Sequence, residues 1–149
     1  MSPVDAAWQA ALAAEQQAAF GYGLLGARVA QADLSLAVAC SDAHEQLRDA
    51  TAAAIHAAGL RPVDPAADYP ALYPVRDAAA ARRLAVRLED GCSAAWRYLY
   101  LQAASAADNA ADRRIRRSAQ AALIANAVRA AQWRTLANPA HATTPFPGI

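Results

Sequence analysis

Helix start and stop signals divide this chain into four long segments of helical periodicity. Ser2 followed by Pro3 has the form of an N-cap with proline at the first helical position, and apolar periodicity continues to about Val29. Each segment spans roughly 25–30 residues, or about 40 Å of α-helix. The chain of 149 residues has the size of one domain and is long enough to bury a core.

The other three helices are expected at 33–59, 77–104 and 108–137. An aspartate precedes each segment, Gly59 and Pro139 mark the ends of the second and fourth, and a short turn around Asp108 separates the third from the fourth. Residues 59–76 carry four prolines and are expected to form a long extended connection. Short links join the first helix to the second and the third to the fourth, so each pair should form an antiparallel hairpin. We therefore predict an all-α fold, an antiparallel four-helix bundle with one long crossover between helices two and three.

The bundle is expected to span residues 1–137, with an extended tail at 138–149 packed on it. Two proline-aromatic segments, 69–74 and 144–148, are expected to lie against the helices and cover apolar surface. The alternative is that Phe146 and its neighbouring prolines bind a groove on a partner.

The composition is dominated by 46 alanines, and all 14 basic residues are arginine, a bias typical of high-GC bacterial genomes. The net charge of +1 indicates no polyanionic partner. Residues 1–112 hold 8 arginines and 13 acids, whereas residues 113–149 hold 6 arginines and no acid. We interpret this asymmetry as complementarity between the last helix and the others, because the arginines have no interleaved aromatics to stack nucleic-acid bases.

The sequence also predicts where the protein is located and the redox state of its two cysteines. The first residues, MSPVDAAWQAALAAEQ, lack a basic segment and an unbroken apolar segment, so we expect no signal peptide. No stretch approaches the roughly 18 apolar residues of a membrane span. We predict a soluble, cytoplasmic protein without membrane or nucleic-acid partners, with Cys40 and Cys92 as reduced thiols.

Three polar residues occupy core positions near the middle of the first three helices. Glu15 and His44 each lie between apolar neighbours, and Glu89 lies at the edge of an apolar face. Because the midpoints of antiparallel helices share one height, the three side chains should converge on one layer, with Cys40 and Cys92 one turn away. Buried carboxylates are costly unless they are paired, ligated or protonated, so this layer is the candidate functional site.

Three segments carry a family resemblance: 10–23 (AALAAEQQAAFGYG), 81–97 (ARRLAVRLEDGCSAAWR) and 144–148 (TPFPG). They resemble a family of small ferritin-like bundles of unknown function from high-GC bacteria. The resemblance covers nearly the whole chain and implies a ferritin-like fold without an established activity. Ferritin-like di-iron proteins carry one Glu on each of two helices and a Glu-x-x-His pair on each of the other two.

This sequence departs from the di-iron ligand pattern. Glu15 and Glu89 match the two single carboxylates. His44 matches the histidine of the second helix, but Ser41 stands where its glutamate would be. The fourth helix has no acid after Asp112 and no histidine. At most three of six ligands remain, so a di-iron centre is not expected.

Two interpretations of the layer stay open. In the first interpretation, Glu15, His44 and Glu89 would hold a single Mn, Fe or Zn ion, with water in the open positions. Alternatively, the layer is a vestige of a lost metal site and needs no cofactor. The buried polar network would then include Tyr22 as a hydroxyl donor, with Arg97 or Arg129 as the cation. We favour the vestige.

No hydrolase arrangement or phosphate-binding loop is found. We leave enzymatic activity open, favour its absence, and predict a role in homo-oligomerisation or binding of a protein partner. Two alternatives remain: a mononuclear metalloprotein with redox or storage-related chemistry, and a helical bundle that binds a small molecule in a cavity around Glu15 and Tyr22.

Overall fold

The computed structural model describes residues 1–106, 109–143, 146 and 148. Over these residues the chain is all-helical and contains no strand. The prediction of an all-α chain with four long helices is confirmed. The long helices are α1 (Pro3–Gly26), α2 (Leu34–Ala57), α3 (Ala78–Ser105) and α4 (Ala110–Ala137), and the short 3-10 helices are η1 (Gln31–Asp33), η2 (Pro70–Leu72) and η3 (Pro139–His141).

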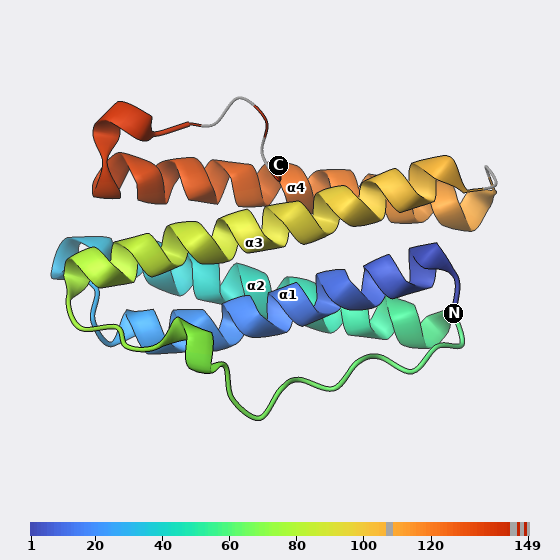
Figure 1. The fold of residues 1–149 in the computed structure, drawn as a ribbon, viewed down its shortest axis with the longest axis horizontal. Coiled ribbons are helices and arrows are strands. Elements are labelled where there is room, and N and C mark those ends of the chain that lie inside the picture. The colour runs from blue at the N-terminus through green and yellow to red at the C-terminus, as the bar shows by residue number, and fades with distance from the viewer. Residues whose placement is uncertain (107–108, 144–145, 147, 149) are drawn as a thin grey trace.

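The four long helices lie side by side (Figure 1). α1 packs against both α2 and α3, and α3 packs against α4. At one face of the α3–α4 pair, Arg134 of α4 pairs with Asp90 of α3, so the basic last helix does meet acidic residues of another helix. None of the helices in the described part of the chain combines the length and the apolarity needed to cross a bilayer.

Side-chain caps begin three of the four long helices. Ser2 Oγ accepts a hydrogen bond from the Asp5 amide at 3.1 Å while Asp5 Oδ2 accepts one from the Ser2 amide at 2.9 Å, which forms a capping box. Asp77 caps α3 at 2.7 Å, and Asn109 caps α4 at 2.9 Å. These caps explain why the helix starts can be read from the sequence. The turn expected around Asp108 lies outside the described residues.

Asp33 differs from its expected role as a side-chain cap of α2. It makes no capping hydrogen bond. Its carboxylate, which is 2% exposed, accepts from Arg82 Nε at 2.7 Å and Nη2 at 3.2 Å. Arg82 Nη1 also donates to the Leu136 carbonyl at 3.0 Å. The guanidinium donates two hydrogen bonds to the buried carboxylate, whereas a single backbone amide would donate one. Asp33 and Arg82 therefore connect the start of α2 to α3 and to the end of α4.

Two other expected boundaries are wrong. α1 ends at Gly26 and not near Val29, because the amides of Arg28 and Val29 both turn back to the Leu25 carbonyl at 2.9 and 3.0 Å. The tail was expected to be without helix, yet Pro139–His141 forms the short η3. Proline is tolerated there because it stands in the first turn.

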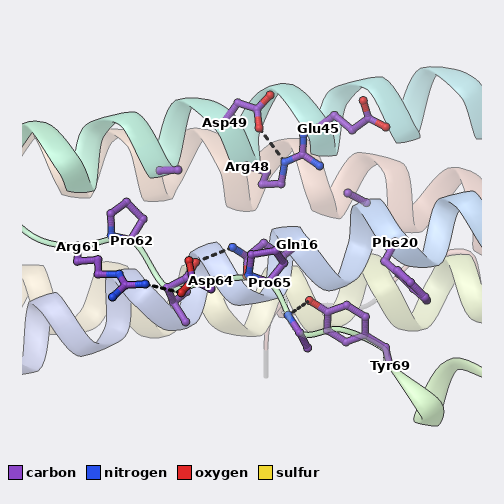
Figure 2. Close-up of a pocket in the computed structure, with 14 residues that line it drawn as sticks. Gln16, Phe20, Glu45, Arg48, Asp49, Arg61, Pro62, Asp64, Pro65 and Tyr69 are labelled. Carbon is purple, nitrogen blue, oxygen red and sulfur yellow. Dashed lines mark hydrogen bonds and ion pairs between the residues drawn. The ribbon is translucent and has the colours of Figure 1, made fainter.

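The crossover between α2 and α3 begins at Gly59, whose φ of +80° suits glycine at the end of a helix. Two glutamines of α1 then hold it in place. Gln9 donates to the Arg61 carbonyl and accepts from the Val63 amide, both at 2.8 Å. Gln16 donates to the Val63 carbonyl at 2.8 Å (Figure 2). The extended connection expected from the prolines is therefore fixed along α1, with one 3-10 turn at η2.

The tail meets the helices only in part. A Cβ on Gly148 would lie 2.6 Å from the Ser93 carbonyl oxygen, so Gly148 lies directly against α3. Phe146, however, is 71% exposed. The expectation that its ring covers apolar surface of the helices is therefore wrong. Residues 144, 145, 147 and 149 lie outside the described residues.

Gly21 is the point of close approach between α1 and α3. A Cβ there would lie 2.6 and 2.9 Å from the two terminal methyls of Leu88, and 3.3 Å from Leu72 of the crossover. Gly23, two residues later, is exposed and has no such neighbour within 4 Å. The two glycines therefore differ in packing although they share one helix.

We expect Gly23→Ala to raise the free energy of unfolding by about 0.5–1 kcal/mol, because alanine is the better helix former. Gly21→Ala gains the same propensity but forces the buried Leu88 to move, so we expect it to be less stable than Gly23→Ala by about 1 kcal/mol or more. Urea denaturation of both variants tests this. Equal stabilisation by the two substitutions would contradict the close packing at Gly21.

Candidate functional site

His44 lies between two carboxylates at the middle of the helices. Its Nδ1 is 2.6 Å from Glu15 Oε2, and its Nε2 is 3.0 Å from Glu89 Oε1. All three residues are fully buried. They come from α2, α1 and α3, so the structure brings together the three residues that the helix midpoints place in one layer.

This geometry requires a proton on each ring nitrogen of His44. An ionised carboxylate can only accept hydrogen bonds, and a neutral imidazole has one nitrogen that can only accept as well. Burial lowers the pKa of His44, but the hydrogen bonds and charges of Glu15 and Glu89 outweigh it and raise the pKa to about 9. His44 is therefore an imidazolium at neutral pH.

The remaining carboxylate positions are filled by three further donors. Trp96 Nε1 donates to Glu15 Oε1 at 2.7 Å. The Tyr22 hydroxyl donates to Glu89 Oε1 at 2.6 Å, and Arg129 Nε donates to Glu89 Oε2 at 3.1 Å. Every carboxylate oxygen thus accepts at least one hydrogen bond. We call these residues the polar cluster: Glu15, Tyr22, His44, Glu89, Trp96 and Arg129.

The charges of the polar cluster compensate one another. Glu15 and Glu89 carry two negative charges, and protonated His44 and Arg129 carry two positive charges, which gives a formal sum of zero. The Arg129 side chain is 14% exposed and the Glu89 side chain is fully buried. The Tyr22 ring also stacks on the His44 ring at a centroid distance of 5.3 Å. A buried charge group of this kind is tolerated because each charge has a partner and a hydrogen bond.

Sequence reasoning placed Tyr22 and Arg129 in this network, and the structure brings both to Glu89. Arg97 lies elsewhere: it is half-buried near Gly148, and no hydrogen bond or ion pair joins it to any other described residue. Trp96 was not anticipated as a donor. A signal was present, because Trp96 follows Glu89 by two helical turns on the same face, and a buried indole N–H usually finds a partner.

One ion cannot take the predicted ligands Glu15, His44 and Glu89 together in this geometry. The two carboxylates face opposite nitrogens of the imidazole ring, so an ion at either nitrogen would meet only one of them. The 2.6 Å contact between His44 and Glu15 is also too short for two ligands of one ion, which lie roughly 3 Å apart or more when each is about 2.0–2.2 Å from the metal.

A different set of potential ligand atoms is compact. One ligand atom each from Glu15, His44 and Cys92 lies within 4.8 Å of the other two, and all three residues are buried. Burial, followed by the charges of Glu15 and Glu89, raises the pKa of the Cys92 thiol well above its usual range. Such a set would suit zinc only after His44 and Cys92 lose their protons and the His44–Glu15 contact opens.

Tyr22 of the polar cluster and the two nearby cysteines favour their neutral forms. Burial and the charge of Glu89 raise the pKa of both Tyr22 and Cys40. Cys40 and Cys92 are buried free thiols. Neither thiol nor the phenol is therefore activated as a nucleophile, because a reactive cysteine needs a lowered pKa and access to solvent.

The proton on His44 predicts a pH dependence of stability. The folded-state pKa of about 9 exceeds the ordinary value of 6.5, so this stabilisation is complete below about pH 6.5 and is lost as pH rises through 9. The loss should approach about 3 kcal/mol between pH 6 and pH 10. Chemical denaturation across this range measures it.

His44→Gln is the control, because glutamine cannot titrate: its stability at pH 6 should be lower by about 3–5 kcal/mol, with no loss of this size on the way to pH 10. If the variant does not fold, an NMR titration of the wild-type His44 ring gives the same information. A midpoint near 6.5 would contradict the double hydrogen bond.

Comparisons with known proteins agree with this helical chain. The family model described as a domain of unknown function (DUF4439) matches residues 7–149. The crystal structure of a conserved hypothetical protein, rv2844, from Mycobacterium tuberculosis is similar, with a TM-score of 0.80 and 32% sequence identity over 90% of this chain and 96% of that chain. No curated protein matches the chain. The chain belongs to the DUF4439 family, which confirms the expected membership of a family of unknown function.

Proposed function

We propose that this DUF4439 protein is a non-catalytic, ferritin-like four-helix bundle in which the polar cluster replaces a metal centre. Its role is then to present a stable helical surface for association with a second copy of the chain. Three sets of observations support this proposal: the course of the helices, the residues at the former ligand positions and the exposed apolar side chains.

The course of the helices is the first support. In Figure 1 the chain runs in one direction along α1 and back along α2, and it reverses again between α3 and α4. The long crossover joins the two hairpins. This course of the chain supports an antiparallel bundle with one long crossover, as in ferritin-like folds.

The observation that carries the proposal lies on α4. Asn126 and Arg129 have the spacing of a Glu-x-x-His pair, and Ser41 and His44 have the same spacing on α2. The Arg129 guanidinium bonds both to Asn126 and to Glu89. A cationic side chain thus neutralises the carboxylate that a metal ion would otherwise neutralise.

The exposed apolar side chains support the association role. Ile124 and Val128 are 58% and 55% exposed one turn apart on α4. Val38 on α2 and Tyr98 on α3 are also more than half exposed. The Ile124–Val128 pair, with two branched aliphatic side chains at helical spacing, is suited to packing against another helix.

Metal content tests the replacement of the metal centre. Wild-type protein purified without chelator and then exposed to Mn, Fe(II) or Zn should hold well under one ion per chain by elemental analysis. Asn126→Glu/Arg129→His restores the pair on α4, removes the competing cation and should bind at least one ion per chain, with a rise in Tm.

The matched control, Arg117→Glu/Gln120→His, creates the same pair on the exposed face of α4 and should bind no more than wild type. Stoichiometric metal in the wild type that disappears in Glu15→Gln or Cys92→Ser would contradict the proposal. It would favour the mononuclear alternative instead, for which the compact Glu15, His44 and Cys92 set is the supporting observation.

Sedimentation over a wide concentration range tests the association. The mass should rise with concentration, and Val128→Glu should shift the transition to at least about tenfold higher concentration, because a charge would be buried in the contact. Gln120→Glu, on an exposed part of the same helix, is the control and should leave the transition unchanged. A concentration-independent monomer would contradict the proposed role.

A further inference from the structure

A cavity of about 920 Å³ opens at one end of the molecule, where α1 and α4 begin and α2 and α3 end. This is the end that carries the N-terminus in Figure 1. Val4, Trp8 and Ile115 line it together with several alanines. The volume falls within the range of roughly 300–1,000 Å³ that is usual for small-molecule sites. The wall is largely apolar.

Asp112 is the polar residue that distinguishes this cavity. It lines the cavity and is only 8% exposed. Its amide donates to the Asn109 cap, but its carboxylate has no hydrogen bond or ion pair with any residue that the structure describes. Among the residues that the structure describes, the fully buried acids are paired: Glu15 with His44, and Glu89 with Arg129.

Asp33, at 2% exposure, is likewise paired with Arg82. Asp112 is largely covered, but its carboxylate oxygens are not among the fully buried polar atoms that lack a partner, so they stay accessible from the cavity. No described cation neutralises this charge, which the α4 N-terminus stabilises only in part. A cation bound in the cavity would supply the missing partner. Two further charged residues line the cavity, Asp5 and the exposed Arg114, and their formal charges cancel. The wall therefore keeps one net negative charge, which a single positive charge on the ligand would neutralise.

The cavity beside the crossover lacks this feature. It measures about 660 Å³ and lies between α1, α2 and residues 61–69. Figure 2 shows that its arginines already have partners: Arg48 pairs with Asp49 at 2.7 Å and Arg61 with Asp64 at 2.8 Å. The aspartates are largely exposed as well. The unpaired Asp112 carboxylate therefore makes the cavity at the end of the helices the better candidate for binding a charged ligand.

We propose that the cavity at the end of the helices binds a small organic monocation, an amine carried on an apolar or aromatic body. The ammonium group lies against the Asp112 carboxylate. The apolar body packs against Ile115 and the half-buried Trp8, whose indole ring attracts a cation and also offers apolar surface. This site is separate from the polar cluster and does not depend on its metal status.

Binding of phenethylamine tests the site, with 2-phenylethanol and phenylacetate as neutral and anionic probes of the same shape. Calorimetry and tryptophan fluorescence report binding. We expect phenethylamine to bind at least about tenfold more tightly than either of the others, the effect of one charge-assisted hydrogen bond. Asp112→Asn should remove this preference, while Asp77→Asn, which affects the α3 cap at the opposite end, should keep it.

A second variant separates loss of the cavity from loss of the charge. Ala57→Trp places a large side chain into the cavity from an exposed position on α2, and it should abolish binding of all three probes while circular dichroism stays helical. Equal affinity for the amine and the anion would overturn the proposal. So would an unchanged preference in Asp112→Asn, or the absence of phenethylamine binding at millimolar concentration.

Discussion

The hydrogen bond between His44 and Glu89 joins two helices, α2 and α3, that otherwise share little contact. α2 packs mainly against α1, and it reaches α3 through His44 and Glu89. Because each ring nitrogen faces a carboxylate, one proton decides whether these contacts attract or repel. α1 and α3 also pack directly on each other, so the protonated imidazole adds a buried polar connection of α2 to α3 that apolar packing does not supply.

Because the core is rich in alanine, contacts other than apolar packing are needed to fix the positions of the helices. Many of the buried residues of the core are alanines, and small side chains interdigitate weakly, so apolar packing alone would allow the helices to slide or rotate past one another. Charged contacts that join specific partners remove this freedom. Glu89 with Arg129 fixes α3 to α4, and Asp33 with Arg82 fixes the start of α2 to α3. Contacts of this kind favour one arrangement of the helices over others, as a single buried asparagine does in some coiled coils.

Local signals made much of the fold predictable. The capping residues Ser2 and Asp77 and the periodicity between caps depend only on neighbouring residues, and the common height of Glu15, His44 and Glu89 follows from helix midpoints. The features that the sequence left open or missed depend on how each helix is rotated about its axis and on contacts with other helices. Arg129 and not Arg97 reaches Glu89 because α4 turns that face inward. Asp33 stands at the cap position of α2, but its carboxylate accepts from Arg82 of α3 and not from the α2 amides, and no local sequence pattern contains that long-range contact.

The two regions that could bind a ligand differ in whether their charged side chains already have a partner of opposite charge. In the polar cluster the formal charge is already zero, so a divalent ion would have to displace the His44 proton and compete with Arg129, and each step opposes binding. At the end of the helices the situation is reversed, because the Asp112 carboxylate lacks a cation from the described chain and adjoins a large cavity. A chain that pairs its other buried acids so consistently leaves this one available to a ligand. The end of the bundle, rather than its middle, is where binding by this family member is to be sought.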